Sequence, residues 1–279
     1  MKMTEYPVTT RPDQADICLL DGSDGTRKMN VGEFSRSTIS LNAPMMHRLL
    51  FRGQNLGSSV TANQKTAITN GTFEDLYLGD YWVIGGTTWR IVDFDYWYGT
   101  GDTECAEHHV VIMPDSNLGQ ATMNATATTS GGYSGCQMRS ANMNTAKSTI
   151  QGAFGSSILN HREYLINAVS SGYPSAGVWT DSEIELPNEP MIFGSYIYTP
   201  GSTGSITPKR YTNSATQLAL FAVDPTFICK PAGVSARIAY WLRDAVNGTS
   251  FVRVSSYGSP QDTSATQSYG IRPVFGITG

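Results

Sequence analysis

The densest apolar run of the chain lies between residues 73 and 99, and it constrains the fold more than any other segment. It reads FEDLYLGDYWVIGGTTWRIVDFDYWYG and is rich in aromatic and β-branched residues, which favour strands. Gly85 and Gly86 form a two-residue turn signal between YWVI and TTWRIV, so the segment predicts a β-hairpin. We expect Trp82 and Trp89 to fill the core of the fold together with Trp241.

The remainder of the chain supplies further strands and a helical centre. HHVVIMP predicts a buried strand that ends at Pro114. Apolar residues within 144–172 recur near a helical period, interrupted by two glycines, and predict a short helix followed by a longer one that ends near Gly172. The last strings, RIAYWLRDA, SFVRVSSYG and GIRPVFGIT, predict closing strands. This order predicts an α+β fold with antiparallel sheets, two central helices and long loops.

Residues 1–72 differ in composition from residues 73–279, since they contain no tryptophan and a single tyrosine. The string DGSDG between alternating apolar residues predicts a hairpin. Two helices are predicted next, ending at Gly53 and Gly71, and Thr61 with Gln64 forms a capping-box pattern at the start of the second.

These N-terminal elements are too few and too polar to bury much surface by themselves. We therefore predict that residues 1–72 form an extended arm that docks on a neighbouring chain, and that residues 73–279 form the main domain. A small independent N-terminal domain remains the alternative.

Charge and hydropathy exclude several classes of protein. Charged residues make up 15% of the chain, the net charge is −4 and no long basic run occurs, so we expect no nucleic-acid partner. No apolar stretch reaches the roughly 18 residues needed to cross a bilayer, so no membrane insertion is expected. The first residues lack the apolar segment of a secretory signal, and synthesis in a cytosol is expected. The four cysteines are far apart, which favours free thiols.

A series of motifs in fixed order carries a family resemblance over about residues 72–279. The motifs are GTFEDLYLGDYW, WRIVDFDYW, HHVVIMPD, GGYSGCQMR, AFGSSILNHREYLINAV, VWTDSEIELPNEPMIFG, QLALFAVDP, YWLRD and GIRPVF. The series resembles a domain family of unassigned function that is common in phages and prophages of Gram-positive gut bacteria. That family is similar to the C-type-lectin-like fold of phage tropism determinants and formylglycine-generating enzymes. DICLLDGSDGTRKMNVGEF resembles the leading segment of phage fibre and head-decoration proteins.

The resemblance implies a bacteriophage virion structural protein, such as a head or tail fibre, a spike or a capsid decoration. It implies that residues 1–72 dock to other virion proteins or form a homo-oligomer, a trimer by analogy with fibres. A lectin-like domain exposed on the particle surface would then serve receptor binding, with a host surface glycan or protein as the partner. We expect no enzyme activity and no cofactor.

The alternative function is a glycan-processing or oxidase-type enzyme on the same fold. Asp181, Glu183, Glu185 and Glu189 suggest glycoside hydrolysis, because Glu183 and Glu185 would share one side of a strand. The competing interpretation is that these carboxylates cap loops and pair with basic residues. Oxidase chemistry would need a close cysteine pair, for which Cys136 and Cys229 are the candidates.

Metal binding is not expected. His108 and His109 would point to opposite faces of a strand, and His161 is assigned to the longer helix as a structural group. Lectin calcium sites use a Glu-Pro-Asn type loop and a Trp-Asn-Asp strand, whereas this chain has Asn-Glu-Pro at 188–190 and Trp-Leu-Arg-Asp at 241–244. We predict no catalytic residue and no metal ligand.

Aromatic side chains in loops and at strand ends are the candidate ligand-binding residues, because aromatic rings stack on sugars and anchor protein interfaces. The set is Trp97, Tyr98, Tyr173, Trp179, Tyr196, Tyr198 and Tyr257.

Overall fold

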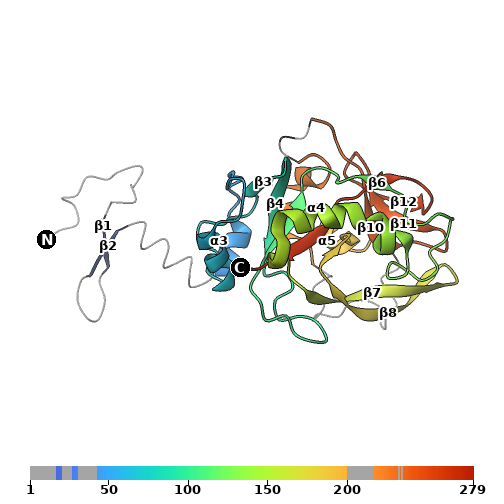
Figure 1. Ribbon diagram of the computed structural model, residues 1–279, viewed down its shortest axis with the longest axis horizontal. Coiled ribbons are helices and arrows are strands. Elements are labelled where there is room, and N and C mark those ends of the chain that lie inside the picture. The colour runs from blue at the N-terminus through green and yellow to red at the C-terminus, as the bar shows by residue number, and fades with distance from the viewer. Residues whose placement is uncertain (1–16, 21–26, 31–42, 200–215, 232, 234) are drawn as a thin grey trace.

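The computed structural model describes residues 17–20, 27–30, 43–199, 216–231, 233 and 235–279. Strands β1 (Ile17–Leu20) and β2 (Arg27–Asn30) pair antiparallel, with Ile17 opposite Asn30. This confirms the predicted N-terminal hairpin, although its turn lies outside the described residues. In Figure 1 the hairpin stands apart from the packed part of the chain, which begins at residue 43 and is called the body below.

Two short helices open the body. They are α2 (Ala43–Leu49) and α3 (Ala62–Thr69), and the capping box predicted from Thr61 and Gln64 begins α3. Arg48 of α2 forms an ion pair with the buried Asp93, and Ile68 of α3 lies in the hydrophobic core. Residues 43–72 therefore pack as part of the body, so the packed unit begins before the predicted boundary at residue 73.

The first sheet has five strands in the order β3-β4-β5-β14-β9. Its members are β3 (Tyr81–Ile84), β4 (Thr87–Phe94), β5 (Val110–Pro114), β14 (Val274–Ile277) and β9 (Ile184–Glu185). The predicted hairpin around Gly85 and Gly86 is confirmed, with Trp82 directly opposite Trp89. The last strand of the chain, β14, thus lies inside this sheet between β5 and β9, and the C-terminus reaches α3 (Figure 1).

The second sheet also has five strands, in the order β12-β11-β10-β13-β6. Its members are β12 (Pro260–Ser264), β11 (Ser250–Val254), β10 (Tyr240–Ala245), β13 (Tyr269–Gly270) and β6 (Gln120–Ala121). β10 and β13 run parallel, and the other pairs of this sheet are antiparallel.

Helical segments connect the sheets. A π-helical turn (Met138–Asn142) leads into α4 (Asn144–Phe154), which buries Ala146, Ile150 and Phe154 and crosses the body in Figure 1. α5 (Glu189–Phe193) begins at the Asn188 cap, and α6 (Ala219–Val223) precedes a 3-10 turn (Pro225–Ile228).

The predicted longer helix ending near Gly172 is wrong. Residues of that segment form β7 (His161–Ser170), which pairs antiparallel with β8 (Tyr173–Ser182) as a separate two-stranded sheet. His161, Glu163 and Leu165 alternate inward on β7, which is the period of a strand. Gly172 is a turn residue with positive φ, not a helix end.

Two hydrophobic clusters fill the body. Trp82 and Trp89 lie in the larger one, which includes residues of α4 and of both sheets, whereas Trp241 lies in a second cluster with Phe251 and Leu165. All three tryptophans are fully buried, as predicted, but they do not share one centre. The α+β class with mainly antiparallel sheets is confirmed.

Cys105, Cys136 and Cys229 are free and buried. Cys136 lies in the second cluster and Cys229 in the first, so the pair considered for oxidase chemistry is divided between the two clusters. In the described part of the chain, no helix combines the length and the apolar character needed to cross a membrane.

Candidate functional site

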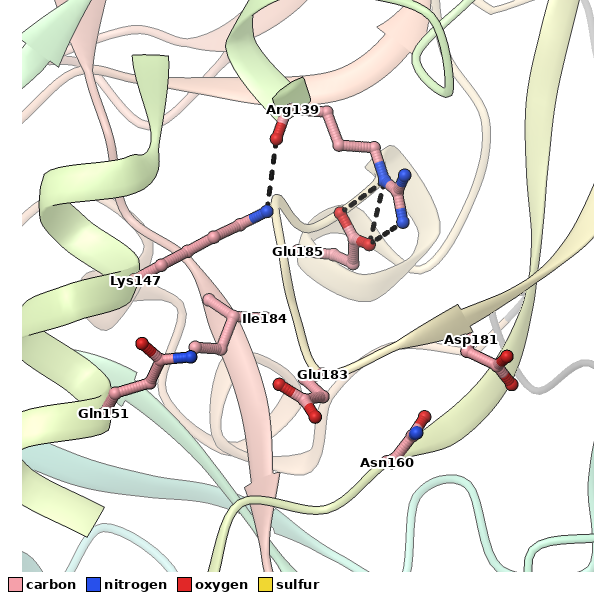
Figure 2. Close-up of a pocket in the computed structure, with 8 residues that line it drawn as sticks. All are labelled: Arg139, Lys147, Gln151, Asn160, Asp181, Glu183, Ile184 and Glu185. Carbon is pink, nitrogen blue, oxygen red and sulfur yellow. Dashed lines mark hydrogen bonds and ion pairs between the residues drawn. The ribbon is translucent and has the colours of Figure 1, made fainter. Parts of the chain in front are cut away.

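A polar pocket of about 200 Å³ lies where α4 meets the end of β8 and the beginning of β9 (Figure 2). Helix α4 provides one wall, and the segment that joins β8 to β9 provides the other. The lining residues are Arg139, Lys147, Gln151, Asn160, Asp181, Glu183, Ile184 and Glu185.

The helical wall presents Lys147 and Gln151, which are four residues apart and therefore lie on one face of α4. The Lys147 ammonium donates a hydrogen bond to the carbonyl of Arg139, with 3.1 Å between the heavy atoms. An ammonium carries three N–H donors, so this contact fixes the side chain and leaves donors for a ligand.

The floor of the pocket is an ion pair between Arg139 and the buried Glu185. The guanidinium approaches the Glu185 carboxylate through Nε and Nη2, at 3.0 and 2.7 Å from Oε1. The same carboxylate accepts hydrogen bonds from the Tyr133 hydroxyl at 2.9 Å and the Ser182 hydroxyl at 3.1 Å. With these acceptor positions occupied, Glu185 anchors the wall of the pocket and has little capacity left for acid, base or nucleophile chemistry.

The two other carboxylates of the pocket are exposed. Asp181 accepts a hydrogen bond from Arg162 at 3.0 Å. Glu183 makes no ion pair with any described residue, although Lys147 and Arg139 line the same pocket. Three of the four carboxylates proposed for hydrolysis thus gather here, while Glu189 is fully buried elsewhere.

A second polar network is centred on Glu163, on the buried face of β7. Glu163 accepts hydrogen bonds from the Trp97 indole at 3.0 Å and from Arg243, and His161 Nε2 lies 3.4 Å from it. Burial by itself would raise the pKa of Glu163, but Arg243 and then His161 lower it to about 2. His161 lies on a strand, which corrects its predicted place on a helix.

His109 is fully buried and neutral. Its Nδ1–H donates to the Glu107 carbonyl, and its Nε2 accepts from the backbone N–H of Trp97. Burial lowers the pKa of His109 to about 3. His108 is partly exposed and bonds Asp95, which also accepts the backbone N–H of His109. Both histidines precede β5, which begins at Val110, so the predicted strand does not include them.

The segments 188–190 and 241–244, which were compared with lectin calcium motifs, lie next to each other. Their carboxylates accept hydrogen bonds from backbone N–H groups. The Asp244 carboxylate accepts the N–H of Glu189 at 2.7 Å, and Glu189 accepts the N–H groups of Tyr198 and Thr199 at 3.0 and 2.9 Å. Burial and then the nearby Glu189 raise the pKa of Asp244 to about 8. Among the described residues, no group of three or more His, Cys, Asp or Glu side chains is arranged to hold a metal ion.

The seven predicted aromatic residues come from separate segments and do not line the pocket. Trp97 is buried between His109 and His161, with ring centroids 5.6 and 4.1 Å away, so its ring faces no external ligand here. Trp179 is half-buried against Tyr164, and Tyr196 is half-buried near Asp244. Large exposed surfaces remain on Tyr98 at 43%, Tyr173 at 56%, Tyr198 at 43% and Tyr257 at 81%.

The pocket residues on α4 were missed by sequence reasoning. The spacing of Lys147 and Gln151 on a predicted helix was the available signal. Arg139 and Asn160 carry no sequence signal of this kind, because they lie outside α4, one before it and one after it.

One comparison with known proteins gives a match. The family model described as "Domain of unknown function (DUF6273)" matches residues 107–279, which is more than half of the chain. No curated protein and no solved structure matches the chain.

Proposed function

The chain belongs to the DUF6273 family, and from that premise we propose that it is a bacteriophage virion structural protein whose body makes contact with the host surface. The phage assignment rests on the resemblance of the motif series and of the N-terminal string. The proposed role is that of a fibre, a spike or a capsid decoration, on the outside of the particle.

The N-terminal hairpin supports docking to another chain. β1 and β2 have four residues each and pair only with one another among the described strands. A two-stranded hairpin is at best marginally stable in water, so a partner surface is expected to complete it. We propose that this partner is another copy of the chain or a particle protein, with a homo-oligomer, a trimer by analogy, as the form on the virion.

The body is proposed to have a C-type-lectin-like fold. The order of strands, α4, long loops and closing strands supports that proposal in part, because β7 takes the place of the second expected helix. The GIRPVF motif contributes Arg272, which is buried at the junction of the two sheets.

The observation that carries a contact function is the set of large aromatic side chains left exposed on the body, namely Tyr98, Tyr173, Tyr198 and Tyr257. Tyrosine gives a large, rigid contact area at a low cost in conformational entropy, together with a hydroxyl that hydrogen-bonds. Such residues suit attachment to a glycan or to a surface protein.

Binding of the full chain to a glycan array and to host cells tests this proposal. We expect the wild type to bind and a variant with all four tyrosines changed to Ser to lose most of the signal, while its unfolding midpoint stays close to that of the wild type. Absence of binding by the wild type to every glycan and to host cells would contradict a contact function.

A hydrolase remains the second candidate, because Asp181, Glu183 and Glu185 line one pocket. The saturated hydrogen bonding of Glu185 argues against it. We expect no reducing sugar to be released from host-surface polysaccharide by the wild type. Release that disappears in Glu183→Gln would establish the enzyme instead.

A further inference from the structure

We infer that the pocket between α4 and the start of β9 binds one uncharged, hydroxyl-rich sugar ring. The inference rests on the proposed contact function and gives it a defined site. It starts from two oppositely charged groups, Lys147 and Glu183, that line one small pocket without forming an ion pair with each other.

The size of the pocket limits the ligand. The volume of about 200 Å³ is many times the minimum that a single water molecule needs. One small polar ring fits this space, whereas a longer saccharide would have to extend out of it over the surface.

The chemistry of the lining selects hydroxyl groups. A hydroxyl donates one hydrogen bond and accepts two, so neighbouring hydroxyls on one ring can donate to the Glu183 carboxylate and accept from the Lys147 ammonium. The side-chain amides of Gln151 and Asn160 each offer both a donor and an acceptor. A sugar ring therefore satisfies both signs of charge at once.

The mixed charge of the lining disfavours an ionic ligand. Arg139 is paired with Glu185, whereas Arg162 is shared between Asp181 and Asp102. The pocket therefore keeps the Lys147 ammonium, the Glu183 carboxylate and the partly compensated Asp181 carboxylate. An anion would approach the carboxylates of Glu183 and Asp181, and a cation would approach Lys147 and Arg139. Either would meet like charge within the pocket.

The site is also preorganised. Glu185 is fixed by Arg139, Tyr133 and Ser182, and Lys147 is held at the carbonyl of Arg139. Gln151 lies on the same helix (Figure 2). Less side-chain freedom is lost on binding when the donors are already positioned on rigid elements.

A larger hollow of about 620 Å³ beside α3 gives the contrast. Its lining includes the carboxylates of Glu74 and Asp75 but no Lys or Arg. The combination of both signs with side-chain amides therefore distinguishes the smaller pocket from the larger one, and Glu74 provides a matched control position.

Titration of the full chain with a panel of neutral monosaccharides, followed by saturation-transfer NMR and calorimetry, tests the inference. We expect at least one sugar to bind in the millimolar range, and inorganic phosphate not to compete. Lys147→Met and Glu183→Ala should each weaken binding about tenfold or more, because each removes hydrogen bonds to a charged group. Glu183→Gln keeps one acceptor oxygen and should retain part of the affinity.

Glu74→Ala should leave sugar binding unchanged, and all variants should melt within a few degrees of the wild type. Wild-type affinity in both Lys147→Met and Glu183→Ala would overturn the inference, as would binding of phosphate in preference to sugars. If both variants keep wild-type affinity for the monosaccharide while the four-tyrosine variant loses binding to the array, the pocket assignment fails and the contact function stands. If the wild type binds neither sugars nor host cells, both fail.

Discussion

Arg272 lies almost fully buried, and its guanidinium ties parts of the body that are far apart in sequence. Its Nε donates to the carbonyl of Pro114 at the end of β5, at 2.8 Å. Its Nη1 lies 3.1 Å from the carbonyls of Phe227 and Ile228 and 3.3 Å from the Tyr240 hydroxyl on β10. One side chain from the closing GIRPVF motif thus joins the first sheet, the 3-10 turn and the second sheet.

Arg272→Lys is expected to lower the free energy of unfolding by about 3 kcal/mol, because a single ammonium does not reach acceptors on both sides and leaves some of them buried without a donor. Chemical denaturation measures the change. Arg162→Lys, at an exposed ion pair with Asp102, is the control and should cost less than about 1 kcal/mol. Equal effects of the two substitutions would contradict the role assigned to Arg272.

Asp244 gives a prediction about pH. Its pKa is raised to about 8 in the folded protein by burial and by Glu189, whereas an aspartate in an unfolded chain titrates near pH 4. Between about pH 4 and pH 8 the folded state holds a proton that the unfolded state has released. The contribution of this group to the free energy of unfolding therefore falls as pH rises, by up to about 1.4 kcal/mol per pH unit.

Asp244→Asn keeps an acceptor for the backbone N–H of Glu189 and removes the titration. Denaturation at several pH values should show a flatter dependence between pH 4 and pH 8 in this variant, and greater stability relative to the wild type at pH 8 than at pH 5. Parallel curves for the two proteins would show that Asp244 does not titrate in this window.

At the scale of single residues, burial is easier to predict from the sequence than partners are. The tryptophans at 82, 89 and 241 are buried, and their large apolar surface is enough to predict this from the residue type and its apolar neighbours in the sequence. Trp97 is predicted to be a ligand-binding residue in a loop but lies buried. Its ring contacts His109 and His161 and its indole N–H donates to Glu163, and these contacts form only in the folded chain. Saturation of Glu185 by Arg139 and Tyr133 is likewise a tertiary property.

Elements with their own local signals are predicted correctly. The Gly85-Gly86 hairpin and the Thr61 capping box carry turn and cap residues that specify them. The segment 161–172 has no such cap, and its apolar residues fit a helical period and a strand period about equally well. Pairing with β8 decides in favour of the strand, because it buries His161, Glu163 and Leu165 on one side.

The β7–β8 hairpin is held to the body by a loop whose backbone approaches it closely. Gly132 has a φ of +59°, and a Cβ there would lie 2.4 Å from the carbonyl oxygen of Ile166 on β7. Gly132→Ala is expected to lower the free energy of unfolding by about 2–3 kcal/mol, through backbone strain and this contact. Thermal or chemical unfolding measures it.

Gly152→Ala is the matched control for that substitution. Gly152 lies inside α4 with open space around the position of a Cβ, so alanine there should raise stability by about 0.5–1 kcal/mol. Opposite signs for the two glycines are the expected result. A neutral Gly132→Ala would mean that the loop does not hold β7.

The whole molecule combines a hairpin without a described partner and a body with two hydrophobic clusters, exposed tyrosines and one pocket of mixed charge. The α+β class can be predicted from the order of strands and helices in the sequence. The division of the core into two clusters cannot, because it depends on which strands pair across long connections. The role on a phage particle remains a prediction from resemblance.

The central claim is that the chain is displayed on a virion for contact with a host. Gold-labelled antibody against the body, applied to purified intact particles and viewed by electron microscopy, tests it most directly. We expect label at regular positions on the outside of the particle, together with the chain in the protein profile of those particles. Particles that carry neither the label nor the chain, while the chain is abundant in the lysate, would contradict it.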